Sequence, residues 1–414
     1  MILAAHRLIR PATARRRSLA LGGLLLAITG LFLTGCSSFS RRPGPAVTTQ
    51  GPRVTVLPAR VISNFFLVEA KQADGKTYRF MIDTGSTTTL VTPALASALR
   101  QKEKKGQART MLVQGANGRV VELPAITLKE ISLGDVHFAR VPAREYDLTE
   151  LSIHVGLPID GVLGFTLFRD TLCTMDYPGA RLELAAQPFL SPATTKPAPR
   201  TATINYDNSK TTPLITVQMG SESFVVLIDS GSDGGLSLNP SGLHPKFSQG
   251  PRRGNLAATL GGDRPQLVGR LAQNISLGSH VIQEPVIDLT DQLSSLGGDL
   301  LRHFKLTFDQ RRRLVTLVRD TEGPVQTPAR RSTGISFQRL SSYWKVLSLI
   351  PDTPVIALPL RPGDLCIRIN GEPVSAWDYE RYSKLLKNAP KVTYTFLNAA
   401  KEQDHEIAVF DLVP

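Results

Sequence analysis

The sequence of 414 residues predicts a mostly β protein with two similar lobes followed by a smaller α+β unit. A segment of roughly 130 residues occurs twice with the same order of motifs, which indicates duplication of a whole lobe rather than a short repeat. Both copies are rich in short runs in which apolar and polar residues alternate, as in strands with one buried face. The C-terminal part combines strands with a helical stretch at 378–387. We therefore expect lobes over 54–190 and 201–320, and a separate domain over 334–414.

The first 35 residues have the features of a signal peptide. Five arginines precede an apolar run at 19–32, which is too short and wrongly flanked for a transmembrane helix. The run ends in Leu33-Thr34-Gly35-Cys36, which resembles the lipobox of bacterial lipoproteins. This resemblance implies a lipidated Cys36, a flexible tether over 36–53 and, because Ser37 follows the cysteine, an outer-membrane anchor facing the periplasm. The alternative is an ordinary signal peptide with a chance cysteine.

Each predicted lobe contains an aspartate directly after an apolar run. Asp83-Thr84-Gly85-Ser86 follows Phe80-Met81-Ile82, and Asp229-Ser230-Gly231-Ser232 follows Val225-Val226-Leu227-Ile228. Each string predicts a buried strand that ends in a tight turn containing glycine. A buried aspartate is costly unless it has partners or a chemical role. Two such aspartates in matching positions suggest two carboxylates that meet.

The two copies match well beyond these strings. A glycine follows each aspartate after 32 residues, at Gly115 and Gly261. Later motifs recur in the same order: Ile131-Ser132-Leu133-Gly134 with Ile275-Ser276-Leu277-Gly278, and Val162-Leu163-Gly164 with Ser295-Leu296-Gly297. An isolated Asp-Gly string is usually only a turn, but the shared register makes that interpretation weaker for the pair.

With these motifs, residues 56–320 resemble the lobes of aspartic peptidases, and 160–165 are similar to the bacterial retropepsin-like group. The resemblance implies two retropepsin-like β-barrel lobes, related by internal duplication, in a pepsin-like bilobal arrangement. It also implies an aspartic endopeptidase in which Asp83 and Asp229 share one proton and activate a water against a peptide or protein substrate. Neither a metal nor another cofactor is expected for this reaction.

The same resemblance assigns roles to four hydroxyl side chains. Thr84 and Ser230 would each bond across to the loop of the other lobe. Ser86 and Ser232 would orient the neighbouring carboxylates. The change from threonine to serine between the copies keeps the hydroxyl group at the first of these positions.

Glycines fill two further roles in this hypothesis. Gly85 and Gly231 would let the backbone pass close to the opposite lobe. Candidate flap residues lie at expected hairpin tips: Gly115, Gly118, Gly261 and Gly262. Turn chemistry alone would also explain glycines at these tips.

The loop after the second aspartate leaves two other hypotheses open. Asp233-Gly234-Gly235 replaces Thr87-Thr88-Thr89 of the first copy, and the charge of Asp233 would raise a pKa in the active site. One alternative is therefore an inactive envelope lipoprotein that binds peptides through its cleft and its C-terminal domain. The other is a homodimer in which each lobe pairs with its twin in a second chain.

The C-terminal domain resembles a bacterial PDZ domain, most specifically from Pro351 to Val374. Asn370-Gly371 predicts a hairpin turn with positive φ, and 378–387 predicts the helix that borders a peptide groove. The resemblance implies a peptide ligand that adds to the sheet as a strand. Arg339-Leu340-Ser341-Ser342-Tyr343 stands where a glycine-rich carboxylate-binding loop is expected, so a purely structural module is the alternative.

Cysteine usage and charge narrow the remaining classes of function. We expect Cys173 and Cys366 to be buried free thiols, with a disulfide between them as the alternative. No cluster of Cys and His has the spacing of metal ligands. The net charge of +13 is spread over basic clusters without interleaved aromatic residues, so we expect no nucleic-acid partner.

Overall fold

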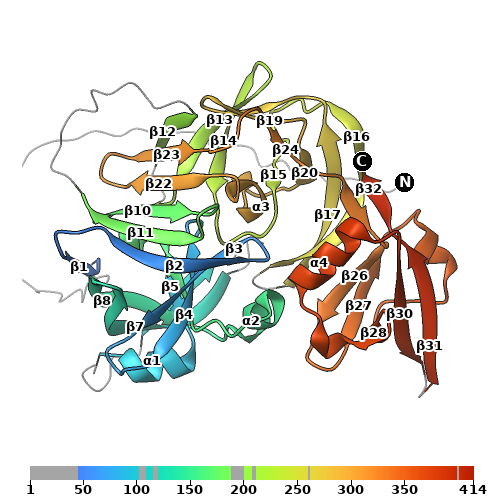
Figure 1. Cartoon of the computed structure of the whole chain (residues 1–414), viewed down its shortest axis with the longest axis horizontal. Helices are drawn as coiled ribbons and strands as arrows, with labels where there is room; N and C mark the ends of the chain where they lie inside the picture. The colour runs from blue at the N-terminus through green and yellow to red at the C-terminus, as the bar shows by residue number, and fades with distance from the viewer. Residues whose placement is uncertain are drawn as a thin grey trace, which may run out of the picture. The chain divides into compact units, whose positions relative to one another are not determined.

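The computed structural model describes residues 45–101, 109–114, 120–187, 200–207, 211–259, 262–398 and 401–414. The signal peptide predicted over 1–35, Cys36 and most of the predicted tether lie outside these residues. Within them the protein is mostly β, as Figure 1 shows. No helix in the described part of the chain has the length and apolar character that a membrane crossing requires.

The first lobe is built from short strands and three small helical segments. Its strands are β1 (Val47–Gln50), β2 (Thr55–Ile62), β3 (Phe65–Lys71), β4 (Thr77–Asp83), β5 (Thr89–Val91), β6 (Arg109–Gln114), β7 (Val120–Leu133), β8 (Val136–Glu145), β9 (Gly161–Gly164), β10 (Thr171–Asp176) and β11 (Arg181–Ala186). Its helical segments are α1 (Pro93–Leu99), α2 (Thr149–Val155) and the 3₁₀ turn η1 (Phe165–Phe168). α1 begins at Pro93, because the Thr92 side chain accepts a hydrogen bond from the Leu95 amide and Pro93 suits the first turn.

The second lobe has a similar order of elements. Its strands are β12 (Thr201–Asp207), β13 (Leu214–Met219), β14 (Glu222–Ile228), β15 (Leu236–Leu238), β16 (Phe247–Thr259), β17 (Gly262–Leu271), β18 (Ile275–Leu277), β19 (His280–Gln283), β20 (Val286–Leu289), β21 (Ser295–Leu296), β22 (Lys305–Asp309), β23 (Leu314–Val318) and β24 (Val325–Gln326). The short helix α3 (Gly298–Leu301) follows β21.

One antiparallel sheet joins the two lobes, in the strand order β2–β11–β10–β22–β23–β12. Figure 1 shows β10, β11, β22 and β23 side by side between the remaining strands of the lobes. The pairing of β10 with β22 is symmetric about Thr174 and Thr307, whose hydroxyl groups lie 2.8 Å apart. This sheet therefore fixes the register of one lobe against the other.

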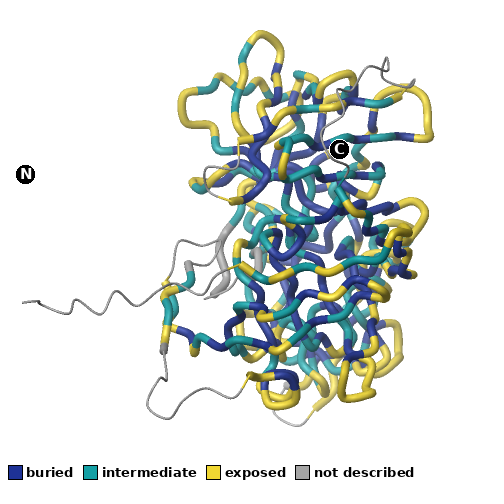
Figure 2. Tube along the Cα trace, turned by 90° about the vertical axis from the view of Figure 1, so that its left-hand side faces the viewer, coloured by how far each residue is buried: buried dark blue, intermediate teal, exposed yellow. Residues whose placement is uncertain are grey.

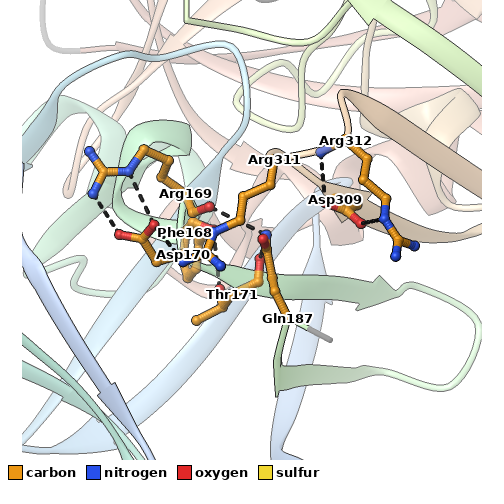
Figure 3. A network of polar contacts seen from close by, with 8 residues as sticks. All are labelled: Phe168, Arg169, Asp170, Thr171, Gln187, Asp309, Arg311 and Arg312. Atoms are coloured by element: carbon orange, nitrogen blue, oxygen red, sulfur yellow. Dashed lines mark hydrogen bonds and ion pairs between the residues drawn. The ribbon is translucent and has the colours of Figure 1, made fainter. Parts of the chain in front are cut away.

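A polar network ties the lobes together at the rim of this sheet (Figure 3). Arg311 of the second lobe donates to Asp170 of the first, and Arg169 also donates to that carboxylate. Hydrogen bonds from Arg169 lower the pKa of Asp170, so the contact is an ion pair at neutral pH. Arg312 lies beside Asp309 at the turn that follows β22.

The hydrophobic core runs continuously through both lobes. One cluster of buried apolar side chains extends from Leu57 in the first lobe to Val325 in β24 of the second. Phe165 and Phe308 meet edge to face across the lobes, with ring centroids 5.3 Å apart. In Figure 2 the buried segments gather toward the inside of the trace, while the exposed segments lie mostly on its outer bends.

The C-terminal unit has a core of its own around Trp344, Tyr394 and Phe396. Its strands are β25 (Arg330–Ser332), β26 (Ile335–Arg339), β27 (Trp344–Leu349), β28 (Leu365–Ile369), β29 (Glu372–Pro373), β30 (Lys391–Asn398), β31 (Lys401–Ala408) and β32 (Phe410–Val413). Its helical segments are η2 (Pro354–Ala357), η3 (Val374–Ala376) and α4 (Tyr379–Asn388). β26 is an edge strand of the main sheet, and α4 is capped by Asp378, whose side chain accepts from the Arg381 amide.

Several details differ from the sequence-based expectations. The predicted tether ends earlier than 53, because 47–50 form β1 and pair with β8. α2 was not predicted, because it spans only seven residues and no side chain caps its N-terminus. Residues 340–343 are a tight hairpin between β26 and β27, closed by a bond from the Leu340 amide to the Tyr343 carbonyl, rather than a substitute carboxylate-binding loop. The prediction of buried free thiols at Cys173 and Cys366 is confirmed.

Candidate active site

Asp83 ends a buried strand and Asp229 directly follows one, and each of these strands runs beside a short parallel strand. β4 runs parallel to β9 and pairs Asp83 with Gly164. β14 runs parallel to β21, and the Asp229 amide, one residue later, donates to the Leu296 carbonyl. The preceding side chains Ile82 and Ile228 are almost fully buried. Burial of both strands thus delivers the two carboxylates to the interface between the lobes.

The structure brings the two aspartates together. The carboxyl groups of Asp83 and Asp229 lie close enough for each to shift the pKa of the other. Asp83 Oδ1 accepts from the amides of Gly85 at 2.9 Å and Ser86 at 3.0 Å. Asp229 Oδ1 accepts from the Gly231 amide at 3.0 Å. Backbone donors therefore hold each carboxylate in a fixed orientation.

Two glycines make this approach possible. A Cβ atom on Gly85 would lie 2.3 Å from Asp229 Oδ1, and one on Gly231 would lie 2.5 Å from Asp83 Cγ. Each carboxylate thus rests on the bare backbone of the opposite loop. Any side chain at these glycines would collide with the carboxylate or push the lobes apart.

The hydroxyl groups after the aspartates bond reciprocally across the interface. Thr84 Oγ1 donates to the Ile228 carbonyl at 2.7 Å and accepts from the Ser230 amide at 3.0 Å. Ser230 Oγ donates to the Ile82 carbonyl at 2.8 Å and accepts from the Thr84 amide at 3.0 Å. Both side chains are buried, so these four bonds are shielded from water.

The two later serines do not have the expected role. The Ser86 hydroxyl donates to the Thr88 carbonyl at 2.9 Å, and only the Ser86 backbone amide contacts Asp83. The Ser232 hydroxyl accepts from the Gly234 amide at 3.4 Å. Both hydroxyl groups therefore stabilise their own turns, because each turn leaves a backbone group that needs a partner.

Burial raises the pKa of both Asp83 and Asp229 above the usual aspartate range, because their charged forms are poorly solvated. The charge of Asp229 raises the pKa of Asp83 further. For Asp229, hydrogen bonds from Gly231 and Asp83 oppose the effect of burial, so its pKa rises less. Between the two ionisations the pair holds a single proton.

Asp233 does not act on the pair of Asp83 and Asp229, here called the dyad, in the expected way. Its Oδ2 atom lies 2.7 Å from His154 Nε2 of the first lobe. Burial opposes ionisation of Asp233, but the bond from His154 and the charge of that ring lower the pKa of Asp233 overall. The prediction that Asp233 raises a pKa of the dyad is therefore wrong, because the Asp233 carboxylate is paired with His154.

Most of the predicted flap residues fall outside the described part of the chain. Gly115 and Gly118 lie between the paired strands β6 and β7, and Gly261 lies between β16 and β17. Gly262 is the first residue of β17 and pairs with Thr259. The assignment of a flap to these hairpins stays a prediction.

Three residues near the site were not found from the sequence. Tyr177 is buried, and its pKa is raised by burial and by the charges of Asp229 and Asp83; its hydroxyl has no partner among the described residues. Asn64, in the turn between β2 and β3, donates to the Asp233 carbonyl at 2.7 Å. The third residue is His154, which contacts Asp233. Of the three, only Tyr177 could have been suspected from the sequence, because it directly follows the apolar strand β10.

No group of three or more His, Cys, Asp or Glu side chains with the geometry of a metal site occurs among the described residues. The arrangement can instead hold a water between one charged and one neutral carboxyl group, because the paired carboxyls cannot both ionise easily.

The raised pKa of Asp83 predicts how stability depends on pH. The native state binds this proton more tightly than the unfolded chain does, so the contribution is complete below the ordinary aspartate pKa and is lost as pH rises through the raised value. The asparagine in Asp83→Asn carries no charge, so the variant should be as stable as the wild type at about pH 4. At about pH 9 its free energy of unfolding should be higher than that of the wild type by about 1–3 kcal/mol, which is seen as a higher melting temperature.

Asp74→Asn is the matched control, because a hydrogen bond from Tyr78 lowers the pKa of Asp74. This variant should lose stability relative to the wild type at alkaline pH. A melting-temperature difference for Asp83→Asn that does not grow with pH would contradict the raised pKa.

Comparison with known proteins agrees with this geometry for the first lobe. Residues 68–167 match the family model described as aspartyl protease, a segment that includes Asp83 and ends before β10. No curated protein matches the chain. The similarity to aspartyl proteases thus covers this segment of the first lobe.

Proposed function

We propose that the protein is an aspartic endopeptidase whose dyad, Asp83 and Asp229, forms within a single chain. The observation that carries the proposal is the close approach of the two half-buried carboxyl groups, each placed against a glycine of the opposite loop. The match of residues 68–167 to the aspartyl protease model supports the same reaction class.

The reaction follows from the single shared proton. The charged carboxylate takes a proton from a bound water while the water oxygen forms a bond to the scissile carbonyl carbon. The neutral carboxyl gives its proton to the carbonyl oxygen, which produces a tetrahedral diol. When the C–N bond breaks, the leaving nitrogen takes the proton that the first carboxylate gained from water, while one diol hydroxyl returns its proton to the other carboxylate as the C=O bond re-forms. The products are a carboxylic acid and an amine. The pair then holds one proton again.

The two lobes, we further propose, arose by internal duplication. Thr84 and Ser230 make equivalent bonds to each other's loops, and β10 pairs with β22 symmetrically about Thr174 and Thr307. This symmetry supports one dyad per chain rather than a homodimer, because each lobe already has its partner.

The rate of peptide hydrolysis per mole of protein tests this point. A dyad within one chain would be contradicted if this rate rose with protein concentration.

The dyad is tested by neutral substitutions in each lobe. Asp83→Asn and Asp229→Asn should each reduce kcat for a quenched peptide library by at least about 10³-fold, since neither variant can provide both a proton donor and a proton acceptor. Circular dichroism and melting temperature should remain those of a folded protein. Turnover by Asp229→Asn at the wild-type rate would exclude the shared dyad.

Glycine variants test the geometry of the same site without removing a carboxylate. Gly231→Ala places a Cβ against Asp83 and should abolish turnover. Gly51→Ala is the control, because no atom lies within 4 Å of its Cβ position. Equal activity of these two variants would mean that the dyad does not require the close approach of the loops.

We also propose that the protein is lipid-anchored in the bacterial envelope through Cys36. Separation of membrane and soluble fractions of the cell tests this proposal. The sequence Leu33-Thr34-Gly35-Cys36 after an apolar run supports this proposal. Cys36→Ser should move the protein from the membrane fraction to the soluble periplasmic fraction. Cys173→Ser, which changes a buried thiol, should leave the protein in the membrane fraction. Retention of Cys36→Ser on the membrane would contradict lipid anchoring at this residue.

A second candidate function is peptide binding by the C-terminal unit, which we propose to be PDZ-like. β26 is an edge strand, and together with α4 it lines a cleft of about 940 Å³. An extended peptide could pair with this edge. Part of this edge is already engaged, because the Tyr379 hydroxyl donates to the Phe337 carbonyl and accepts from the Arg339 amide. The Ser336 hydroxyl of the same strand also accepts from the Leu256 amide of β16.

Labelled peptides test this candidate on the full-length Asp83→Asn protein by fluorescence anisotropy. Ser383 lines the cleft on α4, so Ser383→Trp should raise Kd by about 10-fold or more. Ser341→Trp, in the hairpin outside the cleft, should leave Kd unchanged. Binding without any hydrolysis by the wild type would favour the inactive peptide-binding lipoprotein over the peptidase.

A further inference from the structure

His154 joins three distant parts of the chain at the edge of the candidate active site. It lies near the end of α2 in the first lobe, and its Nε2 atom is 2.7 Å from Asp233 Oδ2 in the second. Its ring centroid is 5.8 Å from that of Phe65 and 4.6 Å from that of Tyr379 in the C-terminal unit. The side chain is only 27% exposed, so these contacts set its position.

The residue that His154 holds belongs to the loop of the second aspartate. Asp233 follows Asp229 by four residues, and the intervening Ser232 carbonyl accepts from the Gly298 amide at 2.7 Å. The carbonyls of Gly234 and Gly235 accept hydrogen bonds from the backbone amides of Asp299 and Gly297. The loop is thus tied to the same glycine-containing segment that flanks Asp229, and a displacement of Asp233 would pass to the dyad.

The C-terminal unit supports His154 from the other side. Arg339 at the end of β26 donates from Nη1 to the Ile153 carbonyl, in the helix turn that carries His154. Its Nε atom donates to the Trp377 carbonyl, which fixes the guanidinium beside α4. The Tyr379 hydroxyl is itself bonded to β26, so the ring that packs against His154 has a fixed position.

The charges at this contact favour an ion pair. Burial alone would lower the pKa of His154, and the charge of Arg339 acts in the same direction. The hydrogen bond and the negative charge of Asp233 outweigh both, so the pKa of His154 is raised overall. A protonated ring holds the Asp233 carboxylate more firmly than a neutral ring would.

We propose that His154 is a positioning residue for peptide hydrolysis, which holds the loop of Asp229 in place through Asp233 while Arg339 and Tyr379 of the C-terminal unit hold His154. This inference rests on the proposed peptidase activity. It assigns the C-terminal unit a part in forming the active site, in addition to any peptide that the unit binds.

Steady-state kinetics on the full-length protein test the proposal. His154→Ala should lower kcat by about 10- to 100-fold with KM changed less than threefold, because the reacting groups lose alignment while the substrate contacts stay. His154→Gln should restore kcat to within about threefold of the wild type, since its amide Nε2 can donate to Asp233. A merely structural role would not produce this split between kcat and KM or this rescue.

His137→Ala is the matched control, because His137 forms a similar pair with Glu130 at 2.9 Å on the surface of the same lobe. It should leave kcat unchanged. The double variant of His154→Ala with Asp233→Asn should be no slower than the slower single variant, since both remove the same contact. Unchanged kcat in His154→Ala, failure of His154→Gln to restore it, or additive losses would overturn the proposal.

A second readout separates this proposal from the peptidase proposal. A peptide whose scissile amide is replaced by a secondary alcohol mimics the tetrahedral diol and requires an aligned dyad but no turnover. His154→Ala should bind it at least about 10-fold more weakly than His137→Ala does. Equal affinities would overturn the role of His154 alone, whereas a wild type that neither cuts peptides nor binds this mimic would overturn both proposals.

Discussion

The candidate site depends on one constraint, which is that the two aspartate loops touch backbone to carboxylate. Each carboxylate occupies the space that a Cβ atom of the opposite glycine would need. The hydroxyl groups of Thr84 and Ser230 bond to the opposite loops and are shielded from water. A small separation of the two loops would break these bonds, and each buried donor left unpaired costs about 1–3 kcal/mol. The lobes therefore meet in one arrangement, and that arrangement sets both the contact of the carboxyls and their raised pKa values.

The rest of the fold supplies the free energy that keeps this contact closed. Two carboxyl groups held together away from water are unfavourable for folding. The sheet shared between the lobes and the core that runs through them offset this cost, and they also prevent the lobes from sliding, since the pairing of Thr174 with Thr307 has a fixed register. The apolar contact of Phe165 with Phe308 crosses the same boundary. Stability far from the dyad is thus what holds the dyad in an unfavourable electrostatic environment, as catalytic sites commonly require.

The sequence predicted the parts of this arrangement that follow from local patterns. Apolar runs before Asp83 and Asp229 gave the buried strands, and the shared spacing of the glycine motifs related the two copies. The role of Ser86 was predicted wrongly, because a hydroxyl beside a carboxylate can bond equally well to its own turn. The contact between His154 and Asp233 was beyond prediction, since it joins residues 79 positions apart through α2, a helix without a clear sequence signal. Contacts of this kind depend on how finished elements pack, which no local pattern encodes.

The pairing of Asp233 also changes the interpretation of the second loop. As an isolated third carboxylate it would repel the charge of the dyad and favour an inactive protein. In the structure its charge is balanced by His154, and its backbone carbonyl is held by Asn64, so the departure from the first copy comes with partners for each new group. A loop that had lost its function would have no need of a histidine from another lobe, supported in turn by Arg339 and Tyr379. The two lobes thus differ at this loop because the loop of the second lobe also contacts His154, which in turn packs against the C-terminal unit, and this asymmetry is compatible with a working dyad.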